Sequence, residues 1–404
     1  MPTPNAVLIR NALLWDGAAD QPVPGLSLRV EGGRIAALGP NLPDENATVM
    51  DAGGRLVMPG LIDCHVHLGA ATDPSERYPD SPPSFLSWQM ARNAERSLLA
   101  GYTTLRDLAS EHSANIHLAR ATELGLVQGP RIIAAGAGIC ITGGHSWTLG
   151  GRQADGADEM RRAVREQLRE GAGCIKLIAT GGVITPGSQP GAPQMTPEEL
   201  GAAIEEAHKA GKRVAAHAHG TIGIKNAVRA GVDSIEHGSL LDDEAVKLMR
   251  EHGTYLVPTL SAHHNYRRMG RGTGTPDFIV EKIERLAEAQ DRSIRLAIKA
   301  GLKIAAGTDA GNLHTHHGNN AQEITLLNHF GLPRIEALRA ATSRAADLLD
   351  LVDETGRLRP GLSADLIVVD GDPFQDLSIL EGGKSVQAVM LRGAWVRTIG
   401  SSGG

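Results

Sequence analysis

Two histidines separated by a single residue, His65 and His67, are the first residues of this chain with an evident chemical use. Residues i and i+2 of a β-strand point to the same face, so both imidazoles can reach one metal ion. The apolar stretch at 55–62 predicts a buried strand that ends at this pair. A histidine pair at a strand end is often not a ligand pair, so the interpretation depends on what later strands supply.

Ligand-type side chains recur at the ends of later apolar stretches. His217 and His219 share one face at a strand end, His237 ends the next strand, and Asp309 follows the last one. Side chains at the C-terminal ends of barrel strands converge on one mouth. Imidazole and carboxylate groups brought together in this way predict a metal centre.

Lys176 lies inside the apolar stretch 174–179 and needs a separate explanation. An ammonium group has no lone pair and cannot bind a cation, and a lysine in a strand can simply extend to the surface. Burial beside dications would instead depress its pKa and expose a nucleophilic amine. Such an amine can add CO2 to give a carbamate, an anionic bridging ligand with two oxygens.

These residues require repeated strands to position them. Eight strands are predicted: one ending at His65, and the others at 103–108, 131–138, 174–179, 213–218, 233–237, 254–260 and 302–307. Helical periodicity lies between them, for instance at 197–210, 242–251 and 278–299, and several helices end on Ala-Gly directly before a strand. Repeated strand–helix units predict an α/β fold, a TIM-type (β/α)8 barrel. An open doubly wound sheet is the competitor, but no Gly-x-Gly-x-x-Gly turn follows the first strand.

The two ends of the chain differ from its middle. Short strands interrupted by Gly, Pro and Asp are predicted at 6–14, 26–30, 34–38 and 48–51, and again at 364–370 and 386–398. We expect both ends to build one small flanking β-sandwich domain, at 1–58 and 356–404, beside a barrel at 59–355.

Composition narrows the class of protein. A chain of 404 residues with 41% hydrophobic residues can bury a large core, and a net charge of −6 gives no reason to expect nucleic acid or an anionic membrane as partner. Three cysteines predict reduced, buried residues, and neither a signal peptide nor a membrane-spanning stretch is evident. A cytoplasmic enzyme is the default expectation.

At this point the sequence resembles a known family, the amidohydrolase superfamily. The branch is that of metal-dependent Xaa-Pro and Xaa-hydrophobic dipeptidases (prolidases), which also contains ochratoxinase and lies near imidazolonepropionase. The resemblance covers nearly the whole chain. It is carried by 59–67, 101–107, Thr142-Gly143-Gly144-His145, Ile175-Lys176, His217-Ala218-His219-Gly220, Ile235-Glu236-His237-Gly238, Gly307-Thr308-Asp309 and 360–368.

The resemblance implies a binuclear centre. His65, His67 and Asp309 would bind the more buried metal, His217 and His237 the other, and carboxylated Lys176 (N6-carboxylysine) would bridge them with a hydroxide. Two divalent ions are implied, and zinc fits imidazole and carboxylate ligands best, although manganese and cobalt stay open.

The same resemblance implies roles around the centre. Asp309 would accept a proton from the hydroxide and pass it to the leaving amine. His219 stands where related sequences often have Tyr, and it would stabilise the oxyanion or hold the substrate. His145, in a loop with two glycines, would contact the substrate, with a loop-stabilising hydrogen bond as the alternative.

Other candidates have ordinary interpretations. A solvated loop is the favoured reading for His314, His316 and His317, a structural ion pair for Arg106–Asp107, and a core position for Cys64. The segment after the strand at 254–260 is a candidate partner for a substrate carboxylate, because it contains His263, His264, Arg267 and Arg268.

The predicted substrate is a small amide: a dipeptide or N-acyl amino acid that ends in a hydrophobic or proline-type residue, ochratoxin-type amides included. Hydrolysis of a cyclic amide or deamination, as in imidazolonepropionase, is the alternative, but those relatives typically use one metal and lack the lysine. A catalytically dead scaffold is disfavoured because the ligand set is complete. Relatives in this branch commonly form homo-oligomers, often octamers, and we expect one here.

Overall fold

The apolar stretches in the middle of the chain form short parallel strands that are buried on both faces. The computed structural model describes residues 6–72 and 82–399. Among the described residues, the strands from the middle of the chain form two of the three sheets. One holds β6 (Leu61–Val66), β7 (Tyr102–Asp107) and β8 (Arg131–Ala134), and the other holds β10 (Arg152–Gln153), β9 (Ile139–Cys140), β11 (Ile175–Ile178), β12 (Val214–Ala218), β13 (Ser234–His237) and β14 (Tyr255–Val257).

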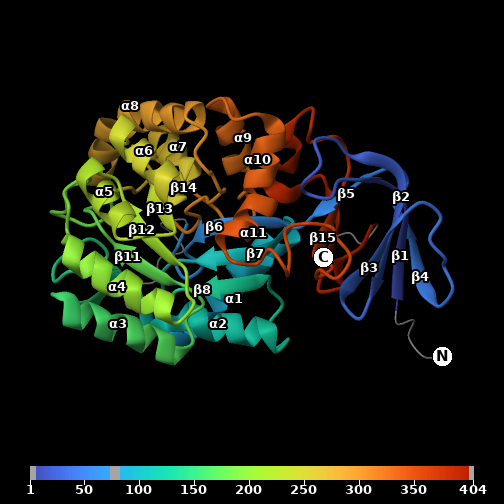
Figure 1. The fold of residues 1–404 in the computed structure, drawn as a ribbon, viewed down its shortest axis with the longest axis horizontal. Helices are drawn as coiled ribbons and strands as arrows, with labels where there is room; N and C mark the ends of the chain where they lie inside the picture. Colours follow the sequence, from blue (N-terminus) through green and yellow to red (C-terminus); the bar gives the residue numbers. More distant parts are fainter. Residues whose placement is uncertain (1–5, 73–81, 400–404) are drawn as a thin grey trace.

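Helices cover the outside of these strands (Figure 1). They are α1 (Pro83–Leu99), α2 (Ala114–Glu123), α3 (Ala157–Glu170), α4 (Pro197–Lys209), α5 (Thr221–Arg229), α6 (Asp243–His252), α7 (Leu260–Met269), α8 (Asp277–Lys299), α9 (Gln322–His329), α10 (Arg334–Ala340) and α11 (Ser343–Leu348). The glycines expected to end helices, Gly101, Gly211, Gly231 and Gly301, all have positive φ, as a left-handed C-terminal residue requires.

The eighth predicted strand is only partly right. The segment 302–310 does run between β14 and β6, because the Leu256 amide donates to the Lys303 carbonyl at 2.9 Å and the Cys64 amide donates to the Ala306 carbonyl at 2.9 Å. Within it, however, only Ile304 and Ala310 form isolated bridges. Asp63 accepts hydrogen bonds from the amide and hydroxyl of Thr308, so this amide bonds a side chain and not a neighbouring strand. A continuous eight-stranded barrel therefore stays a prediction.

Strands from both ends of the chain do meet in one sheet, beside the helical body (Figure 1). Its order is β17-β16-β15-β5-β1-β2-β3, with β4 paired to β1. The strands are β1 (Ala6–Leu14), β2 (Val23–Glu31), β3 (Arg34–Gly39), β4 (Ala47–Asp51), β5 (Leu56–Pro59), β15 (Leu366–Val369), β16 (Val386–Leu391) and β17 (Ala394–Arg397). All eight strands are assigned to a single sheet, so the predicted sandwich is not confirmed.

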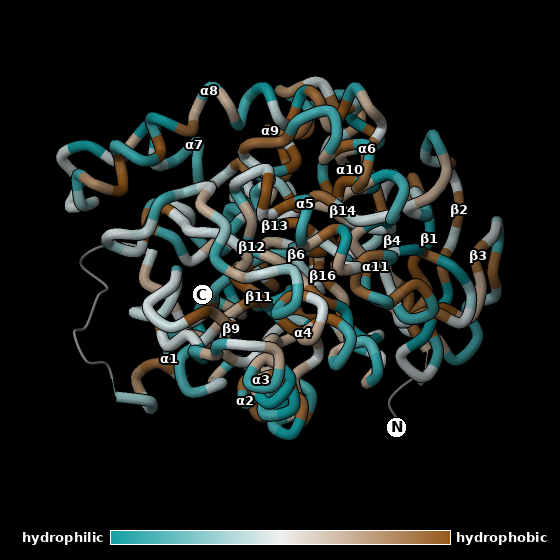
Figure 2. Tube along the Cα trace, turned by 60° about the vertical axis from the view of Figure 1, so that its left-hand side comes forward, coloured by the Kyte–Doolittle hydropathy of each residue, from teal (hydrophilic) through white to brown (hydrophobic). Residues whose placement is uncertain are grey.

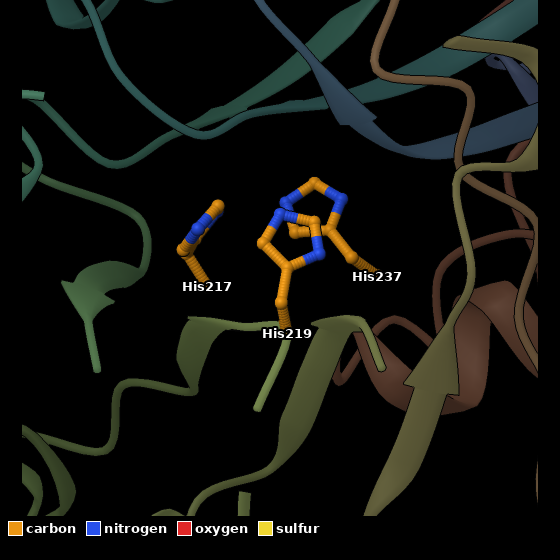
Figure 3. A group of neighbouring side chains, drawn as sticks. All are labelled: His217, His219 and His237. Atoms are coloured by element: carbon orange, nitrogen blue, oxygen red, sulfur yellow. The ribbon is translucent and has the colours of Figure 1, made fainter. Parts of the chain in front are cut away.

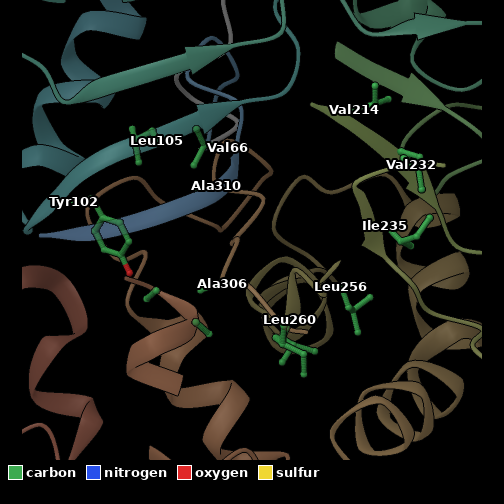
Figure 4. Packing of buried hydrophobic residues seen from close by; sticks show 14 of the residues in the cluster. Val66, Tyr102, Leu105, Val214, Val232, Ile235, Leu256, Leu260, Ala306 and Ala310 are labelled. Carbon is green, nitrogen blue, oxygen red and sulfur yellow. The ribbon is translucent and has the colours of Figure 1, made fainter. Parts of the chain in front are cut away.

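The hydrophobic core follows this division. One large cluster lies between the inner strands and the helices, where Val66, Leu105 and Ile235 pack (Figure 4). A second cluster joins residues of both ends, such as Leu28 and Val368. In Figure 2 the hydrophobic stretches concentrate in the interior strands, whereas the outer helices are mixed. Among the described residues, no helix has the length and apolar character needed to cross a membrane.

Candidate metal centre and active site

The strand ends bring the predicted ligands together. His65 and His67 leave β6 with ring centroids 5.3 Å apart. Asp309 approaches both, because its Oδ1 lies 3.4 Å from His65 Nε2 and 3.2 Å from His67 Nε2. These contacts place the carboxylate against the histidine pair, as the sequence predicted.

A second group of imidazoles lies beside the first. The ligand nitrogens of His217, His219 and His237 lie within 4.8 Å of one another, and Figure 3 shows the three rings facing the same space. His237 also groups with His65 and Asp309 within the same distance. It therefore links the two sets. The structure thus holds a possible metal site built from histidines and an aspartate.

Hydrogen bonds on the far side of the rings fix how they point. Nδ1 of His65 contacts Glu236 Oε2 at 2.8 Å, Nδ1 of His237 contacts Thr259 Oγ1 at 2.7 Å, and Nδ1 of His219 contacts Ser239 Oγ at 2.8 Å. Each bond leaves Nε2 directed toward the centre. Metal-binding histidines usually have such a partner on their other nitrogen.

The backbone is unusual at two of these positions. His237 has φ of 71° and Asp309 has φ of 60°, a region that residues other than glycine rarely adopt. Left-handed backbone at a strand end turns these side chains away from the alternation of the strand. Strain of this kind concentrates at functional sites.

Lys176 is buried, and its Nζ has no hydrogen-bond partner among the described residues. Burial lowers its pKa to about 8. Its charge acts on His65, His217, His237 and Asp309, so the amine is central to the ligand set. An unpartnered buried amine is costly, and this position fits a lysine that is modified or neutralised.

Burial controls the charge state of the histidines. It lowers the pKa of His65 to about 4 and that of His145 to about 3, and it holds the pKa of His217 well below its ordinary value. Burial alone would raise the pKa of Asp309, but His65 and His67 outweigh it and the net shift is downward. Neutral imidazoles and an ionised carboxylate are the forms that bind a metal.

Glu236 is a residue that the sequence analysis did not single out. It accepts from Arg106 at 3.0 Å and from Ser234, and it holds His65 from behind. The predicted pair Arg106–Asp107 is therefore wrong. Consecutive residues of a strand face opposite sides, so Arg106 finds its carboxylate on β13 while Asp107 accepts from Asn115 and the Leu68 amide. A buried arginine in a strand was the available signal for an acid on a neighbouring strand.

A cavity of about 1000 Å³ opens over the centre. The predicted ligands line it together with His145, His219 and His263, and an apolar wall continues it with Val183, Ile184, Leu149, Phe278, Ile279 and Leu313. Cys64 lies in the core, as expected. No arginine is among the lining residues in the described part of the chain.

The remaining candidates lie elsewhere. Arg267 pairs with Asp291 at 3.2 Å, and neither Arg267 nor Arg268 lines the cavity, so this pair is not a carboxylate partner in the structure. His317 is buried rather than solvated, and its Nε2 contacts the His67 carbonyl at 3.3 Å. His314 and His316 contact threonines and do not line the cavity. Of the two neighbouring histidines His263 and His264, only His263 lines the cavity.

Comparisons with known proteins agree with this geometry. A family model described as the amidohydrolase family matches residues 56–396. The ochratoxinase of Aspergillus niger is 34% identical over 363 residues, which covers 83% of this chain and 74% of that protein. The imidazolonepropionase of Paracoccus denitrificans is 27% identical over 381 residues, covering 85% of this chain and 87% of that protein.

Solved structures show the same similarity. A Xaa-Pro dipeptidase with methionine bound in its active site superposes with a TM-score of 0.90 at 34% identity, covering 97% of this chain and 100% of that one. A prolidase complexed with N-methylphosphonate-L-proline gives a TM-score of 0.91 at 32% identity with the same coverage. The resemblance predicted from the motifs is confirmed.

Proposed function

This chain belongs to the amidohydrolase family and is a hydrolytic enzyme, and we propose that it cleaves the amide bond of dipeptides or N-acyl amino acids with two metal ions. The residue at the C-terminal side of the bond would be hydrophobic or proline-type. Ochratoxin-type amides belong to the same proposal.

The observation that carries the proposal is the position of Lys176. Its Nζ is buried without a partner among the described residues, and its charge acts on His65, His217, His237 and Asp309. Addition of CO2 to the free amine, with loss of one proton, would give a carbamate at Lys176 and supply the anionic bridge.

His65, His67 and Asp309 would hold one divalent ion, and His217 and His237 would hold the other.

 Bound divalent ions, zinc by the chemistry of these donors, would lower the pKa of a coordinated water toward neutrality and polarise the scissile carbonyl. The donor set fits such ions, because burial lowers the pKa of His65, His217 and His237, and Nδ1 of His65 and of His237 is already hydrogen-bonded.

The chain's own residues would perform the proton transfers and hold the substrate. Asp309, whose pKa is lowered beside His65 and His67, is ionised and would accept the proton of the attacking water and pass it to the leaving nitrogen. His219 and His145 line the cavity and would donate hydrogen bonds to the oxyanion or the substrate.

The walls of the cavity support a substrate with a bulky apolar group. Phe278, Ile279 and Leu313 face the same space as the histidines. Two similar proteins, the ochratoxinase and the Xaa-Pro dipeptidase, bear names that indicate amide substrates of this kind. With no arginine among the described lining residues, the imidazole N–H groups would hold a terminal carboxylate.

The test is a screen of dipeptides and N-acyl amino acids on purified, metal-loaded protein, followed by a comparison of one free-acid substrate with its C-terminal amide. Loss of the carboxylate leaves its partner unpaired, so kcat/KM should fall about tenfold to a hundredfold for the amide. Equal values for acid and amide, with turnover of cyclic amides and about one metal per chain, would instead favour the imidazolonepropionase-type reaction.

A further inference from the structure

The loop at 181–188 contacts His145 through one side chain. The Thr185 hydroxyl lies 2.8 Å from His145 Nδ1, and it also accepts a hydrogen bond from the Ser146 amide at 3.1 Å. Both Thr185 and His145 are buried. The loop therefore holds the back of the imidazole while the ring lines the cavity.

The front of the ring lies over a glycine. A Cβ added at Gly182 would stand 2.3 Å from His145 Nε2, so a side chain at this position would displace the ring. The ring centroid of His145 is 4.5 Å from that of His217, which sets it beside the predicted ligands. Gly182 thus packs closely over this end of the ring, and Nε2 is the ring nitrogen that no described residue of the loop hydrogen-bonds.

The hydrogen-bond partners of Thr185 determine which nitrogen of His145 carries the proton. In the described part of the chain, the hydroxyl oxygen has two polar partners, the Ser146 amide and His145 Nδ1. The amide can only donate, so the hydroxyl proton has a single acceptor, Nδ1. A neutral imidazole that accepts at Nδ1 carries its own proton on Nε2, and it presents that N–H as a donor.

A buried lysine on α8 holds the same loop in place. Lys282 Nζ donates to the Thr185 carbonyl at 2.9 Å, to the Val183 carbonyl at 3.3 Å and to the Gly182 carbonyl at 3.5 Å. Two of these carbonyls belong to Thr185, which hydrogen-bonds His145, and to Gly182, which packs against its ring. The ammonium group thereby joins α8 to the loop that orients His145. Helix α8 also supplies part of the apolar wall of the cavity, through Phe278 and Ile279.

We infer that Thr185 and Lys282 are positioning residues that hold His145 with Nε2–H directed at the substrate. This inference rests on the proposed function, in which His145 contacts the substrate. Thr185 sets the tautomer, Gly182 leaves room for the ring, and Lys282 fixes the loop.

The first experiment compares two substitutions of Thr185, one that removes its hydroxyl group and one that keeps it. Thr185→Val removes the hydroxyl and keeps the shape, and kcat/KM for an amide substrate should fall about tenfold to a hundredfold. Thr185→Ser keeps the hydroxyl and should stay within about threefold of the wild type. Lys282→Met should also lower kcat/KM, whereas Lys299→Met, an exposed lysine on the same helix, is the matched control and should not.

A double-mutant cycle separates positioning from general structural damage. If Thr185 acts through His145, then Thr185→Val should cause no further loss in a His145→Ala background. Losses that multiply in the double mutant would overturn the inference.

The tautomer can be measured without turnover. In metal-free protein labelled with 15N-histidine, two-bond 15N–1H correlations should place the His145 proton on Nε2, with the His145→Ala variant identifying the signal. Thr185→Val should change this pattern and Thr185→Ser should not. A proton on Nδ1 in the wild type would overturn the inference even if the enzyme cleaves the proposed substrates, and inactivity on all amides would contradict only the proposed function.

Discussion

The environment of Lys176 is unfavourable for a free amine and would suit a lysine that carries a further group. Its amine is buried at 3% exposure, its pKa is lowered to about 8, and no described residue accepts its protons. A buried ammonium without a partner costs free energy, which conversion to an anionic ligand between cations would remove.

Substitution of Lys176 by Ala should abolish or strongly reduce activity and lower the bound metal, because two cations would lose their anionic bridge. Metal analysis and kcat/KM on the same preparation measure both effects, and short carboxylates added to the variant should restore part of the activity. A variant with full activity and two metals per chain would rule out the carbamate.

Asp309→Asn should lower kcat by about a hundredfold to ten-thousandfold, the usual contribution of general acid–base catalysis. The amide is isosteric with the carboxylate, so circular dichroism and Tm should stay close to those of the wild type. Steady-state kinetics with the wild-type metal content confirmed is the measurement. If kcat stays within about threefold, Asp309 does not transfer the proton.

At the scale of elements, one carboxylate connects three strands. Glu236 on β13 binds Arg106 of β7 and His65 of β6, and both Glu236 and Arg106 are fully buried. Burial would raise the pKa of Glu236, but Arg106 and His65 outweigh it and lower it. The ion pair therefore joins the two parallel sheets behind the metal site.

Glu236→Gln should destabilise the protein by about 3–5 kcal/mol, because it leaves the buried charge of Arg106 without its partner. Denaturant unfolding of the metal-free protein measures this directly. Glu244→Gln, which removes the charge of an exposed carboxylate on α6 that pairs with Lys225 of α5, is the control and should leave the midpoint unchanged. An equal midpoint for Glu236→Gln and the wild type would contradict the role of the pair.

Much of the element order could be predicted from apolar periodicity, because strands such as β6, β11 and β12 are buried on both faces and are rich in apolar residues. The expected strand at 302–307 forms only an isolated bridge, at Ile304. The hydrogen bond from Thr308 to Asp63 at the end of this segment is a long-range contact that no local sequence pattern reveals. That the candidate ligands would lie close together could be predicted from their types and spacing. For Glu236 the sequence offers only an indirect signal, the arginine of a buried strand, and it does not reveal the positive φ of His237 that lets both neighbours serve the site.

At the scale of the whole molecule, we expect a homo-oligomer. Trp88 on α1 is 73% exposed, and association would remove such a side chain from water. Light scattering at micromolar concentration should therefore give a mass well above that of one chain. A stable species near 42.5 kDa would contradict this expectation.

The shared sheet also has a consequence for how the chain is made. Strand β5 pairs along its whole length with β15, from Leu56–Val369 to Pro59–Leu366, and these partners are more than three hundred residues apart in sequence. During synthesis the ribosome releases β5 long before β15 exists, so one edge of β5 stays unpaired until nearly the entire chain has emerged. An open strand edge can pair with another chain, and the newborn protein is therefore most vulnerable to aggregation just before its last strands appear.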